Sequence, residues 1–314
     1  MKRHFLTLAD FSRKELEGFL ARALEIKSLA KAGRQICTLK GKTLGLLFEK
    51  PSLRTRVTFE MAMRKLGGDS FYMGAHEVQL GEREAIGDVA RNLERWIDGI
   101  VVRTFYHEVV MELARFSSIP VINGLTDAVH PCQVLSDLLT ILEQKGRLAG
   151  VRVAYVGDGN NVANSWLLGA AIMGMDLAIA CPEGYEPDPK ILQAARKRTR
   201  KSGARLAVVR DPAQAARNAD FIYTDVWTSM GQEREAIRRR IVFQDYQVNL
   251  NLVRKARKGV KVMHCLPAHR GEEITDEVLD GPHSIVFDQA ENRLHAQKAL
   301  LEHFLGGGAG RRNP

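Results

Sequence analysis

The sequence predicts an α/β protein built from two parallel-sheet α/β domains. Strand-like apolar runs alternate with helical patterns along the chain, which is typical of parallel strands joined by crossover helices. The chain has 314 residues, more than a single hydrophobic core usually organises, so two domains are expected. Several polar clusters directly follow apolar runs, and ligands of such sheets bind beyond the carboxyl ends of strands.

The first domain is predicted at residues 1–147. Its strand-like runs are residues 44–48, 70–73, 99–102 and 120–122. The segments between them are long enough for the crossover helices that parallel strands require. A long amphipathic segment, residues 133–148, follows, and Gly146 and Gly150 flank the expected boundary.

The second domain is predicted at residues 148–287. Its strand-like runs are residues 151–156, 177–180, 206–209, 221–224 and 260–263. Residues 288–305 have a helical pattern, and the glycine-rich tail 306–314 is expected to be flexible.

The formal net charge of +9 raises the possibility of a nucleic-acid partner. The richest basic runs are Arg196–Lys201 and Arg238–Arg240, and both read as polar faces of helices. No aromatic residue interleaves with them to stack bases, so we expect no nucleic-acid partner. Attraction of anionic substrates is the expected use of the charge.

The chain is expected to be a cytoplasmic protein without a membrane partner. No stretch reaches the apolar length of a membrane span, and residues 1–5 contain no apolar core of a signal peptide. The four cysteines are too sparse for a disulfide scaffold and have no paired metal-ligand spacing. Reduced thiols, no metal and no cofactor are therefore expected.

The segment Ser52-Leu53-Arg54-Thr55-Arg56 predicts a phosphate site. It follows the apolar run 44–48, so a strand delivers it to the N-terminus of a helix. Unpaired backbone N–H groups, two hydroxyls and two guanidiniums can together hold an anion there. Alternatively, Ser52 is an ordinary N-cap and both arginines lie on a solvated face.

Two further polar clusters also follow apolar runs. They are His130-Pro131-Cys132-Gln133 with Asp137, and His264-Cys265-Leu266-Pro267-Ala268-His269-Arg270. Topology predicts that all three clusters converge on one crevice. The structural alternatives are that His130 is a turn residue, Gln133 a helix cap and Arg103 part of a salt bridge.

These motifs resemble the aspartate/ornithine carbamoyltransferase family. The matching patterns, in order, are Ser-x-Arg-Thr-Arg, His-Pro-x-Gln-x-Leu-x-Asp, Asp225-x-x-x-Ser229-Met230-Gly231, His-Cys-Leu-Pro, and Phe287–Arg293. Five ordered motifs over residues 44–300 are far more specific than one short pattern. The Asp225–Gly231 loop makes the ornithine-specific members the most similar, and the resemblance implies that the final helix packs back on the first domain.

The resemblance implies a carbamoyl-phosphate site whose ligands come mostly from the first part of the chain. Arg54, His130, Cys265 and Arg103 are implied as catalytic residues, with His130 and Arg54 meeting the carbonyl oxygen. The implied carbamoyl-phosphate ligands are Ser52, Leu53, Arg54, Thr55, Gln79, Arg103, His130, Gln133, Cys265, Leu266 and Arg293. Gln79 is implied to come from a neighbouring subunit of a homotrimer, or of an assembly of trimers.

Ornithine is implied to contact Asn161, Asp225, Ser229 and Met230, with Asp225 pairing with its α-ammonium. Cys265 is implied to help keep the side-chain amine neutral, and the alternative is a buried, inert thiol. The turn Gly157–Asn161 invites a dinucleotide interpretation, but Val162 stands where the fingerprint needs its third glycine. His264, Cys265 and His269 do not predict a metal site, because adjacent residues seldom face one ion.

The chain departs from the family pattern at three positions. Leu53 stands where threonine is common, and Ala85 and Val89 stand where the family has serine and threonine. The expected activity is ornithine carbamoylation, in arginine biosynthesis or degradation. A carbamoyltransferase for putrescine or an acylated ornithine, and a non-catalytic phosphate-binding protein of the same fold, are the alternatives.

Overall fold

The computed structural model describes residues 4–81 and 83–306. The chain forms two compact units. One contains the described residues up to Leu139 and those from Asn292 onward, and the other is Thr140–Glu291. Residues 307–314 of the predicted flexible tail lie outside the described residues.

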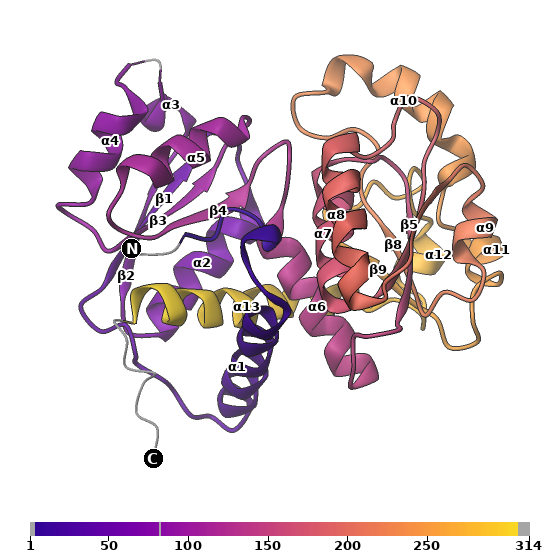
Figure 1. Cartoon of the computed structure of the whole chain (residues 1–314), viewed down its shortest axis with the longest axis horizontal. Coiled ribbons are helices and arrows are strands. Elements are labelled where there is room, and N and C mark those ends of the chain that lie inside the picture. The colour runs from indigo at the N-terminus through magenta and orange to yellow at the C-terminus, as the bar shows by residue number, and fades with distance from the viewer. Residues whose placement is uncertain (1–3, 82, 307–314) are drawn as a thin grey trace. The chain divides into compact units, whose positions relative to one another are not determined.

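The first unit contains a four-stranded parallel sheet (Figure 1). Its strand order is β2-β1-β3-β4. The elements are η1 (Leu8–Asp10), α1 (Arg13–Lys31), β1 (Thr43–Phe48), α2 (Leu53–Lys65), β2 (Asp69–Met73), α3 (Ala75–Val78), α4 (Ile86–Leu93), β3 (Gly99–Arg103), α5 (His107–Phe116), β4 (Val121–Leu125), and the start of α6 (Pro131–Lys145). The end of α13 (Val286–Leu305) completes the unit.

The second unit contains a five-stranded parallel sheet of order β7-β6-β5-β8-β9. Its elements are β5 (Arg152–Val156), α7 (Asn161–Met173), β6 (Asp176–Ala180), α8 (Pro189–Ser202), β7 (Leu206–Val209), α9 (Pro212–Ala216), β8 (Phe221–Thr224), η2 (Glu233–Glu235), α10 (Ala236–Phe243), η3 (Gln244–Tyr246), α11 (Leu250–Val253), β9 (Lys261–His264) and α12 (Asp276–Leu279). The predicted α/β class with two parallel sheets is confirmed.

Right-handed crossovers decide which helices cover which face of each sheet. In the first sheet the chain moves one way from β1 to β2 and the other way to β3 and β4, so α2 covers one face and α4 and α5 the other (Figure 1). In the second sheet the same rule separates α7 and α8 from α9 and α11. Strand order therefore reverses beside β1 and beside β5, and the polar turns that follow these two strands lie at switch points.

Local sequence explains where the main helices begin and end. Ser12 and Glu15 form a capping box at the start of α1. Asp188 caps α8, Pro189 occupies its first position, and Gly203 ends it with a φ of 76°. Gly174 ends α7 in the same left-handed conformation.

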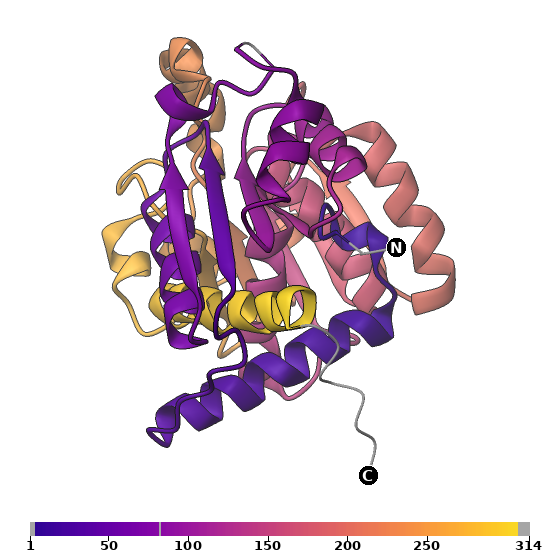
Figure 2. The same cartoon turned by 90° about the vertical axis from the view of Figure 1, so that its left-hand side faces the viewer.

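The last helix belongs to the first unit from Asn292 onward, as predicted. In both views this helix lies next to α1 (Figures 1 and 2). The Lys27 ammonium donates to the Asn292 side chain over 2.8 Å, and an Arg22 amino group donates to Glu302 over 2.8 Å. No helix in the described ranges is both long enough and apolar enough to cross a membrane.

Candidate active site

The predicted phosphate segment forms the N-terminus of α2 in the first unit. Ser52 is the N-cap, and its hydroxyl accepts from the backbone N–H of Thr55 over 3.2 Å. Leu53 is the first helical residue, and its side chain is 73% exposed. Arg54 is half-buried and Thr55 is buried. The sequence has thus placed a hydroxyl, a guanidinium and the helix N–H groups at the carboxyl end of β1, which suits an anion.

Arg293 connects this helix start with the beginning of α6. Its guanidinium is buried and donates from one amino group to Gln133 Oε1 over 2.5 Å and from the other to Thr55 Oγ1 over 3.0 Å. Gln133 in turn donates to Asp137 Oδ1 over 2.9 Å. Three predicted ligands from three helices therefore belong to one network, and the planar guanidinium spans two of them.

Arg103 ends β3 next to the turn that precedes Ser52. It is buried, and its Nε donates to the backbone carbonyl of Lys50 over 3.2 Å. The backbone carbonyl of Arg103 accepts from the N–H of Glu49 over 2.8 Å. Lys50 is itself buried, forms a close ion pair with Asp127, and lies 4.2 Å from the centre of the Phe105 ring. These contacts fix the turn between β1 and α2 against the end of β3.

His130 is buried among positive charges. Desolvation lowers its pKa well below the ordinary value, and the guanidiniums of Arg293, Arg103 and Arg54 lower it further. The imidazole is therefore neutral at pH 7 and carries one N–H. The neutral imidazole of His130 can donate a hydrogen bond to a polarised carbonyl oxygen. A cationic ligand would be repelled here by the three arginines.

Among the described residues, Gln79 is not part of the network that joins Thr55, Gln133 and Arg293. It is exposed, ends α3, and has a φ of 32°. No hydrogen bond or ion pair among the described residues joins it to Ser52, Arg54 or Thr55. Ala85, one of the departures from the family pattern, is the N-cap of α4 and makes no side-chain capping bond, as expected after loss of a hydroxyl.

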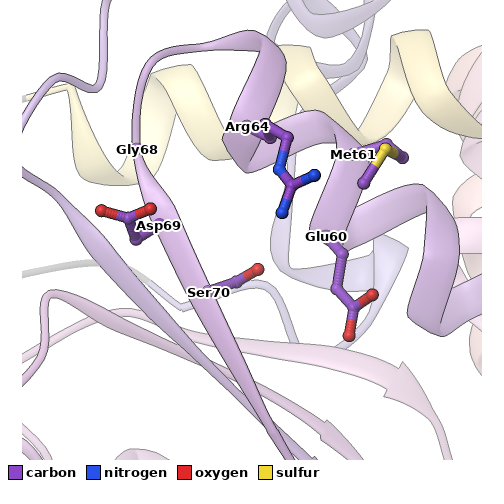
Figure 3. Close-up of a pocket in the computed structure, with 6 residues that line it drawn as sticks. All are labelled: Glu60, Met61, Arg64, Gly68, Asp69 and Ser70. Carbon is purple, nitrogen blue, oxygen red and sulfur yellow. The ribbon is translucent and has the colours of Figure 1, made fainter.

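A polar pocket of about 210 Å³ lies at the other end of α2 (Figure 3). Figure 3 shows Glu60 and Arg64 projecting from α2, and Asp69 and Ser70 at the start of β2. None of the predicted site residues lines this pocket. This pocket is separate from the predicted phosphate segment at the N-terminus of the helix.

In the second unit Asp225 is the centre of a hydrogen-bond network after β8. Its Oδ1 accepts from the Cys265 thiol and from the backbone N–H of Val226, both over 2.8 Å. Its Oδ2 accepts from the side-chain amide of Asn160 over 2.8 Å. The carboxylate is buried and Cys265 is half-buried. Asp225 and Cys265, predicted from separate motifs, are therefore in direct contact.

The turn after β5 is shaped by two glycines. Gly157 has a φ of 137°, and a Cβ on Gly159 would lie 2.3 Å from the backbone nitrogen of Pro187. Glycine is required at both positions because a side chain would be strained or would clash. Asn160 caps α7, and Asn161 is its first residue.

Arg239 of α10 anchors the loop that contains Ser229 and Met230. Its buried guanidinium donates over 2.9 Å both to Asp158 Oδ2 and to the backbone carbonyl of Trp227. Burial raises the pKa of Asp158 to about 6, although Arg239 opposes the shift. The prediction that Arg238–Arg240 is a solvated face is wrong for Arg239, because helical spacing turns this residue inward while its neighbours are exposed.

The loop residues themselves remain accessible. Ser229 is half-buried, and its backbone N–H donates to the Gln232 side chain over 3.2 Å. The Met230 side chain is 39% exposed.

His264 orders the backbone around Cys265. Its Nδ1 accepts from the Leu266 N–H over 2.8 Å, so its Nε2 carries the proton and donates to Glu273 over 2.9 Å. Leu266 has a φ of 58°. Asp225, His264 and Cys265 offer atoms within 4.8 Å of one another. Both nitrogens of His264 are already engaged, so this trio does not fit a metal ion.

The structure brings together Thr55, Gln133 and Arg293 in the first unit, and Asp225 and Cys265 in the second. The convergence of the two sets on one crevice stays a prediction. Sequence reasoning assigned no role to Asn160, Arg239 or Glu273. The cap signal of Asn160, directly before a helical pattern, was available.

Two family profiles together match almost the whole chain. Residues 3–143 match the carbamoyl-P binding domain of aspartate/ornithine carbamoyltransferase, and residues 149–304 match its Asp/Orn binding domain. An ornithine carbamoyltransferase of Thermococcus kodakarensis is 52% identical over 97% of both chains. The anabolic ornithine carbamoyltransferase of Pyrococcus furiosus is 50% identical over 97% of both chains. A solved structure of ornithine carbamoyltransferase from Pyrococcus furiosus has a TM-score of 0.95 at 50% identity and covers 98% of both chains.

Proposed function

The chain belongs to the aspartate/ornithine carbamoyltransferase family, and we propose that it carbamoylates the side-chain amine of L-ornithine. The products are L-citrulline and phosphate. The observation that carries the proposal is the contact between Asp225 and Cys265, next to a loop of the pattern Asp-x-x-x-Ser-Met-Gly, in a chain that matches both domains of the family. The chain is a carbamoyl-group transferase.

We assign the phosphate of carbamoyl phosphate to the N-terminus of α2. Ser52, Arg54, Thr55 and Arg103 are its side-chain ligands, and the N–H groups of the first helical turn add to them. Gln79 is assigned as a further ligand from a second subunit. Positive groups fixed in place stabilise the charge that builds on the departing phosphate.

The carbamoyl carbon is attacked by the neutral side-chain amine of ornithine. The new C–N bond forms, the C–O bond to phosphate breaks, and the proton that the amine loses ends on the departing phosphate. His130, neutral because of burial and neighbouring arginines, donates to the carbonyl oxygen together with Arg54. Gln133, Arg293 and the backbone of Cys265 and Leu266 hold the carbamoyl group.

The amino-acid half of ornithine is assigned to the second unit. Asp225 pairs with the α-ammonium, and Asn161, Ser229 and Met230 complete the contacts. The support is that Asp225 is buried and already accepts three hydrogen bonds, so its position is fixed before ornithine arrives. Cys265 is assigned beside the side-chain amine of ornithine, where its thiolate form can accept a proton from that amine.

The test is citrulline formation by the purified protein with a panel of amines. Ornithine, putrescine, acetylornithine and aspartate are supplied separately with carbamoyl phosphate. Turnover with ornithine alone supports the proposal. Preference for another amine would retain the carbamoyl-phosphate half and reject the ornithine half, and no product with any amine would indicate a binding protein.

We further propose that the enzyme is a homotrimer with shared sites. The supporting observation is that Gln79 is exposed and is not joined to Ser52, Arg54 or Thr55 within the described part of its own chain. Light scattering gives the mass. Arg54→Ala and Gln79→Ala proteins, each nearly inactive, are then dissociated and reassembled together. Recovery of activity in the mixture is expected, because some sites then contain both native residues, and no recovery would reject a shared site.

We assign the enzyme to the cytoplasm and to the biosynthetic direction. The relative from Pyrococcus furiosus, with 50% identity, is named anabolic. The assignment predicts that deletion of the gene makes growth depend on citrulline or arginine. Growth without either would contradict a biosynthetic role.

A further inference from the structure

We propose that Asn160 is a positioning residue that holds the Asp225 carboxylate in the orientation that receives ornithine. This inference rests on the proposed function, because it concerns how the ornithine half of the site is ordered. Asn160 does not contact the substrate in this account. It acts through Asp225, and it differs in role from Asn161, the next residue along the chain.

The orientation of the Asn160 amide is determined by its neighbours. Its oxygen accepts from the backbone N–H groups of Val162 over 2.9 Å and Ala163 over 3.2 Å at the start of α7. The hydroxyl of Tyr155 donates to the same oxygen over 3.1 Å. A flipped amide would place its NH₂ group against these donors, so the NH₂ group must face Asp225.

Tyr155 makes this arrangement rigid. Its ring is fully buried and stacks on Tyr223, with ring centres 5.6 Å apart and planes at 14°. Burial raises the pKa of the Tyr155 phenol well above its ordinary value, and the charge of Asp225 adds to this shift. The phenol therefore keeps its proton at neutral pH and remains a donor to Asn160.

The other side of the Asn160 amide fixes Asp225. The Asn160 side-chain nitrogen donates to Asp225 Oδ2 over 2.8 Å, and Asp225 Oδ1 accepts from the Cys265 thiol and from the Val226 N–H. Without the Asn160 donor the carboxylate can rotate about its terminal torsion, which is broad and weakly restrained by itself. The Asp225 carboxylate, which is assigned to the α-ammonium and accepts from the Cys265 thiol, would then lose its fixed position.

Two variants separate this role from the helix cap that Asn160 also provides. Asn160→Ser keeps a good N-cap oxygen but is too short to reach Asp225. Asn160→Asp keeps the size and the cap, and replaces the donor with a carboxylate oxygen facing the Asp225 carboxylate. Asn249→Ser is the matched control, because Asn249 caps α11 by accepting from the Leu252 N–H over 3.1 Å.

The measurement is the KM for ornithine, the KM for carbamoyl phosphate and kcat of each variant. The dissociation constant of L-norvaline, which is ornithine without its side-chain amine, is measured by calorimetry at saturating carbamoyl phosphate. We expect Asn160→Ser to raise the ornithine KM and the norvaline constant about 10- to 100-fold, as for loss of one charged hydrogen bond. The KM for carbamoyl phosphate is expected to change less than about twofold, because its assigned side-chain ligands lie in the first unit and Cys265 and Leu266 are assigned to the carbamoyl group only through their backbone.

Asn160→Asp is expected to have a larger effect that weakens with falling pH. Two carboxylates at hydrogen-bond distance share a proton, and the shared proton restores a donor to Asp225. A purely structural cap would give neither this pH dependence nor the split between the two KM values, because Asp is as good a cap as Asn.

The inference is overturned if Asn160→Ser has the ornithine KM and norvaline constant of Asn249→Ser. It is also overturned if Asn160→Asp has the kinetics and pH profile of the unchanged enzyme. Melting temperatures measured alongside show whether a variant has lost its fold. If the unchanged protein does not use ornithine at all, the proposed function fails first and this inference falls with it, so the two failures are distinguishable.

Discussion

Replacing Arg293 by lysine should weaken carbamoyl-phosphate binding without removing the positive charge. Arg293 is 2% exposed and reaches Gln133 Oε1 at 2.5 Å with one amino group and Thr55 Oγ1 at 3.0 Å with the other. A lysine ammonium is a single point and can occupy only one of these two positions. One of the two assigned ligands is therefore left without its donor.

The magnitude follows from the lost hydrogen bond. A hydrogen bond to a charged group contributes about 1.5–3 kcal/mol, which corresponds to about a 10- to 150-fold change in an equilibrium constant. We expect the KM for carbamoyl phosphate to rise within this range in Arg293→Lys. The assay is the initial rate of citrulline formation at saturating ornithine, with carbamoyl phosphate varied.

Arg22→Lys is the matched control. Arg22 of α1 pairs with Glu302, which lies on the same helix as Arg293, and within the described residues it makes no hydrogen bond or ion pair with an assigned ligand. Its carbamoyl-phosphate KM should stay within about twofold of the unchanged enzyme. Arg293→Gln adds a second readout: after desolvation, Arg293 is the main cause of the lowered pKa of His130, so removing its charge should raise that pKa toward 6.5. Histidine labelled with carbon-13 reports it by NMR. An Arg293→Lys enzyme with the KM of the control would show that the two-pronged contact of Arg293 does not contribute to carbamoyl-phosphate binding.

Three further predictions test the second unit. Asp158→Asn should remove a pH dependence of stability. The folded pKa of Asp158, about 6, lies above its ordinary 3.8, so the folded state holds the proton more tightly and loses roughly 3 kcal/mol from this group as pH rises from 4 to 6. Urea midpoints at pH 4.5 and 7 check this, and equal pH dependence in both proteins would contradict it. Gly159→Ala should destabilise by more than about 2 kcal/mol, because its Cβ would meet the Pro187 backbone, whereas Gly18→Ala, with open space in a helix, should stabilise slightly; similar melting temperatures would count against the clash. Ser229→Ala should chiefly raise the ornithine KM, and an unchanged ornithine dependence would reject the assigned role of that loop.

Much of the fold was predictable because apolar periodicity is local. The bounds of the predicted strand runs agree with the observed strands within one residue, except that the run 120–122 ends three residues before β4 does at Leu125. The helix predicted at residues 288–305 is observed as Val286–Leu305. The strand orders were not predictable from the runs alone, because alternation of strands and helices does not say on which side of β1 the next strand is added. The parallel pairing of β1 with both β2 and β3 is decided by tertiary structure and not by the local sequence.

The candidate site was predictable where motifs lie next to each other in sequence. Ser52 and Thr55 are three residues apart, so their capping bond follows from helix geometry. The contact of Arg293 with Thr55 joins residues 238 positions apart, and nothing local signals it. The sequence is misleading at Arg239, because a run of three arginines suggests a solvated face, while only the three-dimensional structure shows that the middle one is turned toward Asp158.

Ornithine carbamoylation is tested by counting both products in one reaction. Purified enzyme receives carbamoyl phosphate with and without ornithine, and citrulline and phosphate are measured together. We expect one citrulline for each phosphate released, and almost no phosphate above the spontaneous rate when ornithine is omitted. Enzyme-dependent phosphate release without citrulline, or no ornithine dependence of either product, would contradict ornithine carbamoylation.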